Sequence, residues 1–143
     1  MIVLDTNVIS ETLKHEPDRA VLAWLDSLTD DVALTSITVG ELFTGIRQMP
    51  EGRRRDALLA AVETDFDKFD HDVLLPFDDA AARTYARLHE ACRLNGRALS
   101  TEDGMIASTA LVNGAVLATR NTKDFEGFGL RLIDPWQASA RTA

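Results

Sequence analysis

The sequence IVLDTNVIS, at residues 2–10, decides the fold of this chain. Its first three residues are apolar without polar alternation, which is typical of a strand in a sheet that is covered on both faces. Asp5 follows at once, and open α/β sheets carry their functional groups just beyond the carboxyl ends of strands. An aspartate here can also cap the helix that follows. The stretch therefore predicts a buried first strand that ends in a functional acid or a helix cap.

Size and composition predict a single domain in a reducing compartment. The chain has 143 residues, 45% of them hydrophobic, which is enough for one core without disulfides. Its single cysteine, Cys92, argues against a disulfide framework or a cysteine-based zinc site and favours a cytoplasmic setting. We find no basic leader and no long apolar run, so we expect no membrane association. The domain is expected over 1–136, with a short tail over 137–143.

The formal net charge of −8 argues against a broad basic surface for nucleic acid. It does not exclude nucleic acid as a substrate, because a carboxylate site that holds divalent cations is strongly negative until those ions are counted. An acidic surface would equally suit a basic protein partner.

Short apolar segments alternate with amphipathic ones along the chain. Further strands are expected at 32–34, 73–75, 115–118 and 130–133. Helices are expected at about 7–14, from 16–18 with Pro17 in the first turn, from Thr38 onward, from 53–55 through Phe69, from 78 or 79 to 95, and from about 100 to 113. This alternation predicts a three-layer α/β/α domain with a central, mainly parallel sheet of about five strands and right-handed crossovers.

Two further acids compete with ordinary structural roles. Glu41 lies three residues after Thr38, so it fits a capping box in which its carboxylate reaches back to the Thr38 amide. Asp103 falls on the same helical face as Ile106 and Ala107, where a charge is costly unless it is paired or bound to metal. By contrast, the acids between the fourth helix and the third strand lack the glycine turn of a calcium loop and are expected to be exposed: Asp65, Asp67, Asp70 and Asp72.

Four acids that are distant in sequence all follow strand ends or begin helices: Asp5, Glu41, Asp103 and Asp124. Carboxylates that are packed together repel one another and coexist at neutral pH around hard cations such as Mg²⁺ or Mn²⁺. The pattern therefore favours metal-assisted phosphoryl chemistry.

Four blocks carry a family resemblance: LDTNVIS at 4–10, SITVGEL at 36–42, EDGMIASTA at 102–110 and ATRNTKDF at 118–125. Together they resemble the PIN-domain family, in particular the VapC-type toxins, including the FitB-like branch, of bacterial type II toxin–antitoxin modules. The resemblance covers nearly the whole chain, and four blocks in this order are far more specific than any one of them.

The resemblance implies an endoribonuclease that depends on Mg²⁺ or Mn²⁺ and hydrolyses RNA with a metal-activated water. Its acidic positions match Asp5, Glu41 and Asp103, which we expect to be catalytic and to hold the metal, with Asp124 as a fourth catalytic acid. The residues expected to position the substrate are Asn7, Thr119 and Asn121. A cognate antitoxin and a homodimer are the expected protein partners.

Three alternatives remain from the sequence. A housekeeping PIN-type RNA-processing nuclease would share the site but have no antitoxin. A receiver-like or phosphotransferase domain would also place acids at strand ends, but here the third strand ends in LPF at 75–77 and Asp5 lacks a second aspartate beside it. A catalytically silent α/β binding module is disfavoured by the intact acids.

Overall fold

The computed structural model describes residues 1–67 and 73–138. Phe69, Asp70 and Asp72, together with residues 139–143 of the expected tail, lie outside the described residues. Asp65 and Asp67 are exposed, as predicted. The described residues form five short strands: β1 (Ile2–Leu4), β2 (Val32–Thr35), β3 (Leu74–Leu75), β4 (Val116–Ala118) and β5 (Leu132–Ile133).

The five strands make one sheet in the order β3-β2-β1-β4-β5, and every neighbouring pair is parallel. β1 is central, with Ile2 in register with Val32 on one side and with Val116 on the other. The predicted α/β fold with a parallel sheet of five strands is therefore confirmed. Since all strands run the same way, the residues after β1, β2 and β4 lie together at the carboxyl end of the sheet.

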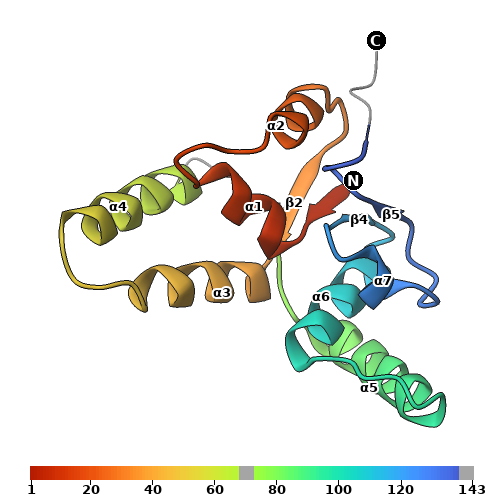
Figure 1. Ribbon diagram of the computed structural model, residues 1–143. Coiled ribbons are helices and arrows are strands. Elements are labelled where there is room, and N and C mark those ends of the chain that lie inside the picture. Colours follow the sequence, from red (N-terminus) through yellow and green to blue (C-terminus); the bar gives the residue numbers. More distant parts are fainter. Residues whose placement is uncertain (68–72, 139–143) are drawn as a thin grey trace.

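Seven helices join the strands in the described part of the chain: α1 (Thr6–Thr12), α2 (Arg19–Asp26), α3 (Ser36–Arg47), α4 (Arg53–Asp67), α5 (Asp79–Leu94), α6 (Thr101–Val112) and α7 (Thr122–Phe125). Figure 1 shows α3 and α4 projecting together to the left of the sheet in this view, and α5 and α6 lying together at the lower right. The short α7 was not expected from the sequence.

Alternate residues of the central strand face two different hydrophobic clusters. Val3 packs in a cluster with Ile106 and Leu117, beneath α5 and α6. Leu4 points the other way, into a cluster with Val8 and the Trp24 ring from α1 and α2. This is the burial expected of a strand that is apolar throughout, because both faces of the sheet are covered.

The start of α2 differs from expectation. We expected Pro17 in the first turn of a helix, but α2 begins at Arg19, with Asp18 as its N-cap. The Asp18 carboxylate accepts hydrogen bonds from the backbone N–H groups of Ala20 and Val21 at 2.8 and 3.3 Å, so the cap decides the start and Pro17 precedes it.

None of the helices in the described ranges is both long and apolar enough to cross a membrane.

Candidate active site

Asp5 serves as both a helix cap and a pocket acid, so the two interpretations of this residue hold together. It follows β1 directly, and its side chain is buried, with only 5% of the residue exposed. One carboxylate oxygen, Oδ1, accepts the backbone N–H of Thr6 at 2.8 Å and so caps α1. The other, Oδ2, accepts the Thr119 hydroxyl at 2.7 Å. Asp5 is thus fixed from its own helix and from the end of the neighbouring strand β4.

Glu41 is not part of a capping box, which corrects that interpretation. The helix begins two residues earlier than expected, at Ser36, because the Thr35 hydroxyl accepts the backbone N–H of Thr38 at 3.1 Å. Glu41 therefore lies in the second turn of α3, and its Oε1 accepts the hydroxyl of Thr6 at 2.8 Å. This hydrogen bond ties the acid of α3 to the residue that follows Asp5.

Asp103 and Asp124 lie near the same carboxyl end of the sheet, on two other helices. Asp103 is half-buried in the first turn of α6, where its N–H donates to the Ser100 hydroxyl at 3.2 Å. Asp124 is exposed on α7, which follows β4. The Asp124 charge raises the pKa of both Asp5 and Asp103. The structure therefore brings all four predicted acids into one electrostatic environment, although Asp124 contributes from the rim.

The acids shift one another's protonation. Burial is the main cause that raises the pKa of Asp5, Glu41 and Asp103 above the ordinary carboxylate value. Carboxylate repulsion adds to it, from Asp124 on Asp5 and from both Asp5 and Asp103 on Glu41. Hydrogen bonds from Thr119 and Thr6 oppose the rise at Asp5. Carboxylates that are buried or half-buried and repel one another are typical of sites whose charge is used for chemistry.

A polar network joins the residues that we expected to position the substrate. Thr119 is fully buried, so its hydroxyl serves Asp5 rather than the solvent side of the pocket. The Asn7 Nδ2 atom and the backbone N–H of Asn121 both donate to that hydroxyl oxygen, at 3.4 and 3.1 Å. Asn7 and Asn121 reach the pocket, whereas Thr119 lies behind it.

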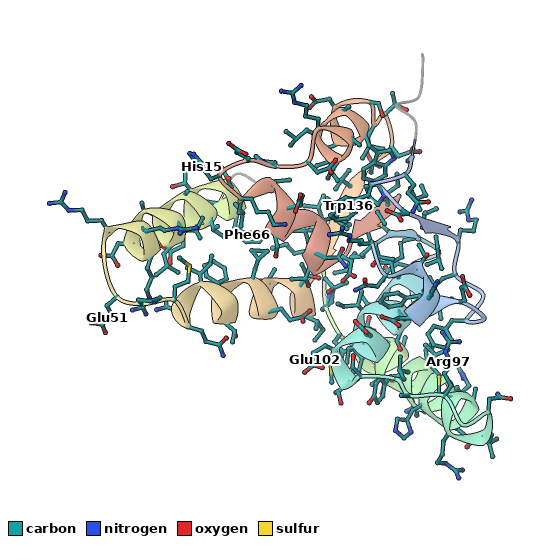
Figure 2. The ribbon with its side chains drawn as sticks, in the orientation of Figure 1. His15, Glu51, Phe66, Arg97, Glu102 and Trp136 are labelled. Atoms are coloured by element: carbon teal, nitrogen blue, oxygen red, sulfur yellow. The ribbon has the colours of Figure 1, made fainter. Side chains whose placement is uncertain are left out.

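The acids open onto a pocket of about 410 Å³ at the carboxyl end of the sheet. It is lined by Asp5, Thr6, Asn7, Ser10, Glu11, Lys14, Glu41, Asp103, Arg120, Asn121 and Trp136. The sequence did not single out Glu11, Lys14 or Trp136 as site residues. Glu11 lies on the helix that Asp5 caps, and Lys14 follows soon after the end of that helix, so their nearness in sequence to Asp5 was the available signal. Trp136 follows the last strand, and only the fold places it at the pocket (Figure 2).

The donor set fits a hydrated hard cation. Within residues 1–67 and 73–138, no three His, Cys, Asp or Glu side chains are close enough together to enclose an ion directly. Mg²⁺ does not need such a cage, since it keeps several waters and binds through one or two carboxylates. Asp5, Glu41 and Asp103 offer only oxygen ligands, and a cation would relieve the repulsion that raises their pKa values.

Comparison with known proteins identifies the family of the chain. The model of the PIN domain matches residues 2–129. "VapC ribonuclease Y4jK" of Sinorhizobium fredii is 46% identical over 96% of this chain and 99% of its own length. "Toxin FitB" of Neisseria gonorrhoeae is 38% identical over 95% of this chain and 99% of its own. The crystal structure of FitAcB from the same organism superposes with a TM-score of 0.90 at 37% identity, covering 96% of this chain and all of the matched one.

The matches extend over nearly the whole chain, and the resemblance drawn from the four sequence blocks is confirmed. The chain belongs to the PIN-domain family, in its branch of VapC- and FitB-type ribonuclease toxins.

Proposed function

We propose that this protein is a Mg²⁺- or Mn²⁺-dependent endoribonuclease, the toxin of a type II toxin–antitoxin module, and that its active site is the acidic pocket at the end of β1. The observation that carries the proposal is the convergence of Asp5, Glu41 and Asp103 on one pocket from α1, α3 and α6, each with a raised pKa. A divalent cation held by these acids would lower the pKa of a bound water and supply positive charge to the reacting phosphate.

The protein side chains then have separate tasks. Asp5 and Asp103 are the proposed direct metal ligands, and Glu41 and Asp124 act directly or through water. Thr6 and Thr119 hold Asp5 and Glu41 in place through their hydrogen bonds. Asn7 and Asn121 face the pocket with amide groups that can hydrogen-bond RNA. Attack by water on the phosphodiester should leave a 5′-phosphate and a 3′-hydroxyl.

Incubation of the purified protein with single-stranded RNA tests the proposal. Cleavage should require Mg²⁺ or Mn²⁺, stop in excess chelator, and be absent from Asp5→Asn and Asp103→Asn. Asp65→Asn is the matched control, because Asp65 is exposed on α4 and does not line the acidic pocket. Undiminished cleavage in chelator, or products that end in a cyclic 2′,3′-phosphate, would contradict the mechanism.

A cognate antitoxin is the proposed protein partner. A ribonuclease that acts in the cytoplasm of the cell that makes it must be neutralised there, and the net charge of −8 suits a partner that presents a basic side chain to the acids. Co-expression with the product of the adjacent gene should yield a co-purifying complex without RNA cleavage. If no neutralising partner is found, a housekeeping nuclease becomes the better interpretation.

A homodimer is proposed on the family resemblance. Light scattering of the purified protein should give twice the mass of the 15.7 kDa chain.

A further inference from the structure

The two basic side chains that line the acidic pocket differ in what they contact. Lys14 Nζ lies 2.6 Å from Glu11 Oε2, and the Glu11 side chain is only 7% exposed, so this cation already has a carboxylate partner. Arg120 is exposed, and its guanidinium makes no hydrogen bond or ion pair with any residue that the structure describes. Its guanidinium carbon lies 5.0 Å from the centre of the Trp136 ring.

Arg120 does not act as a counter-ion for the pocket acids. The pKa values of Asp5, Glu41 and Asp103 are shifted by burial, by neighbouring carboxylates and by hydrogen bonds from hydroxyl or backbone groups, and no basic side chain of the described residues is among the causes. The charge of Arg120 is therefore available to something that enters the pocket from outside.

The backbone of Arg120 is tied to the acids even though its side chain is not. Its N–H donates to Asn7 Oδ1 at 3.3 Å, and Asn7 and Asp5 both bond the hydroxyl of Thr119. The Trp136 side chain packs against the hydrophobic cluster that contains Leu4, the residue before Asp5. Figure 2 labels Trp136 beside the start of the chain. The Arg120–Trp136 pair is thus held in a fixed place relative to Asp5.

We propose that Arg120, stacked on Trp136, binds a backbone phosphate of the RNA strand next to the scissile phosphate. A guanidinium that lies over an aromatic face keeps its N–H edge free, and that edge can donate two parallel hydrogen bonds to phosphate oxygens. In a pocket with four acidic side chains, an unpaired cation at the rim offsets repulsion of the polyanionic strand. Arg120 touches substrate in this assignment, and Trp136 positions Arg120. The assignment rests on the proposed ribonuclease function.

Binding to a cleavage-blocked protein tests this step apart from catalysis. We would titrate Asp5→Asn, alone and combined with Arg120→Gln, with a short single-stranded RNA in Mg²⁺ over a series of salt concentrations. Loss of the arginine should weaken binding about tenfold. It should also lower the slope of log affinity against log salt by about 0.7, the value for one phosphate on a single strand.

Matched variants separate a phosphate contact from a general loss of charge. Arg87→Gln removes an exposed arginine of α5 that bonds Thr84 and does not line the pocket, so affinity and salt slope should stay unchanged. Arg120→Lys should keep the salt slope and recover only part of the affinity, because an ammonium lacks the planar fork.

The role of Trp136 has its own readout. In the protein with Asp5 intact, Trp136→Leu and Arg120→Gln should both raise KM for RNA and leave kcat nearly unchanged, whereas Trp136→Phe should restore KM by providing a stacking face. Melting curves of each variant check that the fold is kept. If Trp136→Leu does not fold, the two Arg120 variants decide the question.

Unchanged affinity and salt slope in Arg120→Gln would overturn the proposal. It would also fail if Arg120→Gln bound RNA normally but released the co-purifying partner protein, since the arginine would then belong to a protein interface. Failure of the ribonuclease function is distinguishable, because in that case the parent protein itself would not cut RNA.

Discussion

The Thr119 hydroxyl donates a 2.7 Å hydrogen bond to Asp5 Oδ2, across 114 positions of sequence. The bond exists because β1 and β4 are neighbours in the sheet, with Leu4 in register with Ala118, so that the residues after each strand emerge side by side. Together with the Thr6 N–H, this bond holds the buried carboxylate in place and opposes the rise of its pKa.

Thr119→Val should therefore impair the site more than its small change in shape suggests. Removal of the hydroxyl leaves Asp5 Oδ2 buried without its donor, which should cost about 1–3 kcal/mol of the free energy of unfolding at neutral pH and raise the pKa of Asp5 further. The loss should shrink at acidic pH, where Asp5 is protonated. Denaturant unfolding at several pH values measures both effects.

Thr109→Val is the control for that variant. Thr109 is also fully buried, but its hydroxyl donates to the backbone carbonyl of Met105 within α6. Its substitution should show no comparable dependence on pH and should leave RNA cleavage intact. Equal pH dependence in the two variants would show that the effect does not come from Asp5.

Asp103→Asn should stabilise the metal-free protein near neutral pH. The folded state raises the pKa of Asp103, so the contribution of this group to the free energy of unfolding is fully present below the ordinary carboxylate range and is lost as pH rises through the raised pKa. The variant should match its parent at about pH 3 and exceed it by up to about 1 kcal/mol at neutral pH, since Asp103 is only half-buried.

In Mg²⁺ we expect the parent to become more stable than Asp103→Asn. The ion should raise the melting temperature of the parent by binding the folded state and raise that of Asp103→Asn much less. Asp78→Ala is the contrasting cap variant, because Asp78 accepts the backbone N–H of Ala81 at 2.9 Å and starts α5. It should lose about 0.5–2 kcal/mol with or without Mg²⁺. If Asp103→Asn is destabilised in chelator and its melting temperature rises in Mg²⁺ as much as that of the parent, Asp103 does not bind the metal.

Arg97→Met should loosen the helix that carries Asp124. The Arg97 guanidinium donates to the backbone carbonyls of Asp124 and Lys123 at 2.9 and 3.1 Å, and also to that of Glu126. It also lies over the Phe128 ring, 4.5 Å from its centre, and Figure 2 shows it beside α7. We expect a loss of about 1–3 kcal/mol and a higher Mg²⁺ requirement for cleavage.

Arg97→Lys should rescue little of this loss, since a single ammonium cannot replace a fork that holds three carbonyls. Arg93→Met provides the comparison, because Arg93 is an exposed residue of α5 with no hydrogen bond to α7. An unaltered Mg²⁺ requirement in Arg97→Met would mean that α7 keeps its place without the arginine.

Gly104→Ala should strain the packing of α6 on α5. A Cβ there would lie 2.6 Å from Tyr85 Cε2 and 3.2 Å from Leu99 Cδ2, so the Tyr85 ring must move, at a cost of about 1–3 kcal/mol. Gly40→Ala is the matched control, because a Cβ at this position in α3 meets nothing within 4 Å. It should stabilise the protein by about 0.5–1 kcal/mol. Thermal melts of the two variants should move in opposite directions.

The sequence by itself determined the layered fold and most of the acids. The apolar run before Asp5 predicted a strand buried on both faces, and the structure has it at the centre of a parallel sheet. The sequence also predicted that a helix starts at 78 or 79 and ends at 95, and α5 has Asp78 as its N-cap and Asn95 as its C-cap. Both ends are local patterns of hydrogen bonding and backbone geometry.

The tertiary structure moved one predicted helix cap. The sequence pattern placed the cap at Thr38, but Thr35 pairs with Leu75 at the end of β2 and has the extended backbone of an N-cap, so the helix begins after Thr35. Glu41 is therefore not part of the predicted capping box, and its carboxylate accepts a hydrogen bond from Thr6, 35 positions away.

Contacts that depend on strand order were also beyond the sequence. Arg120 follows β4 and Trp136 follows β5, and their side chains meet because these two strands pair in the sheet. Arg97 lies between α5 and α6 and reaches α7, which follows β4. Spacing along a chain encodes which residues share a helix face or a strand. Which helix starts meet at the end of a sheet is set by how the strands pair, because burying both apolar faces of β1 requires its neighbours to come from distant parts of the chain.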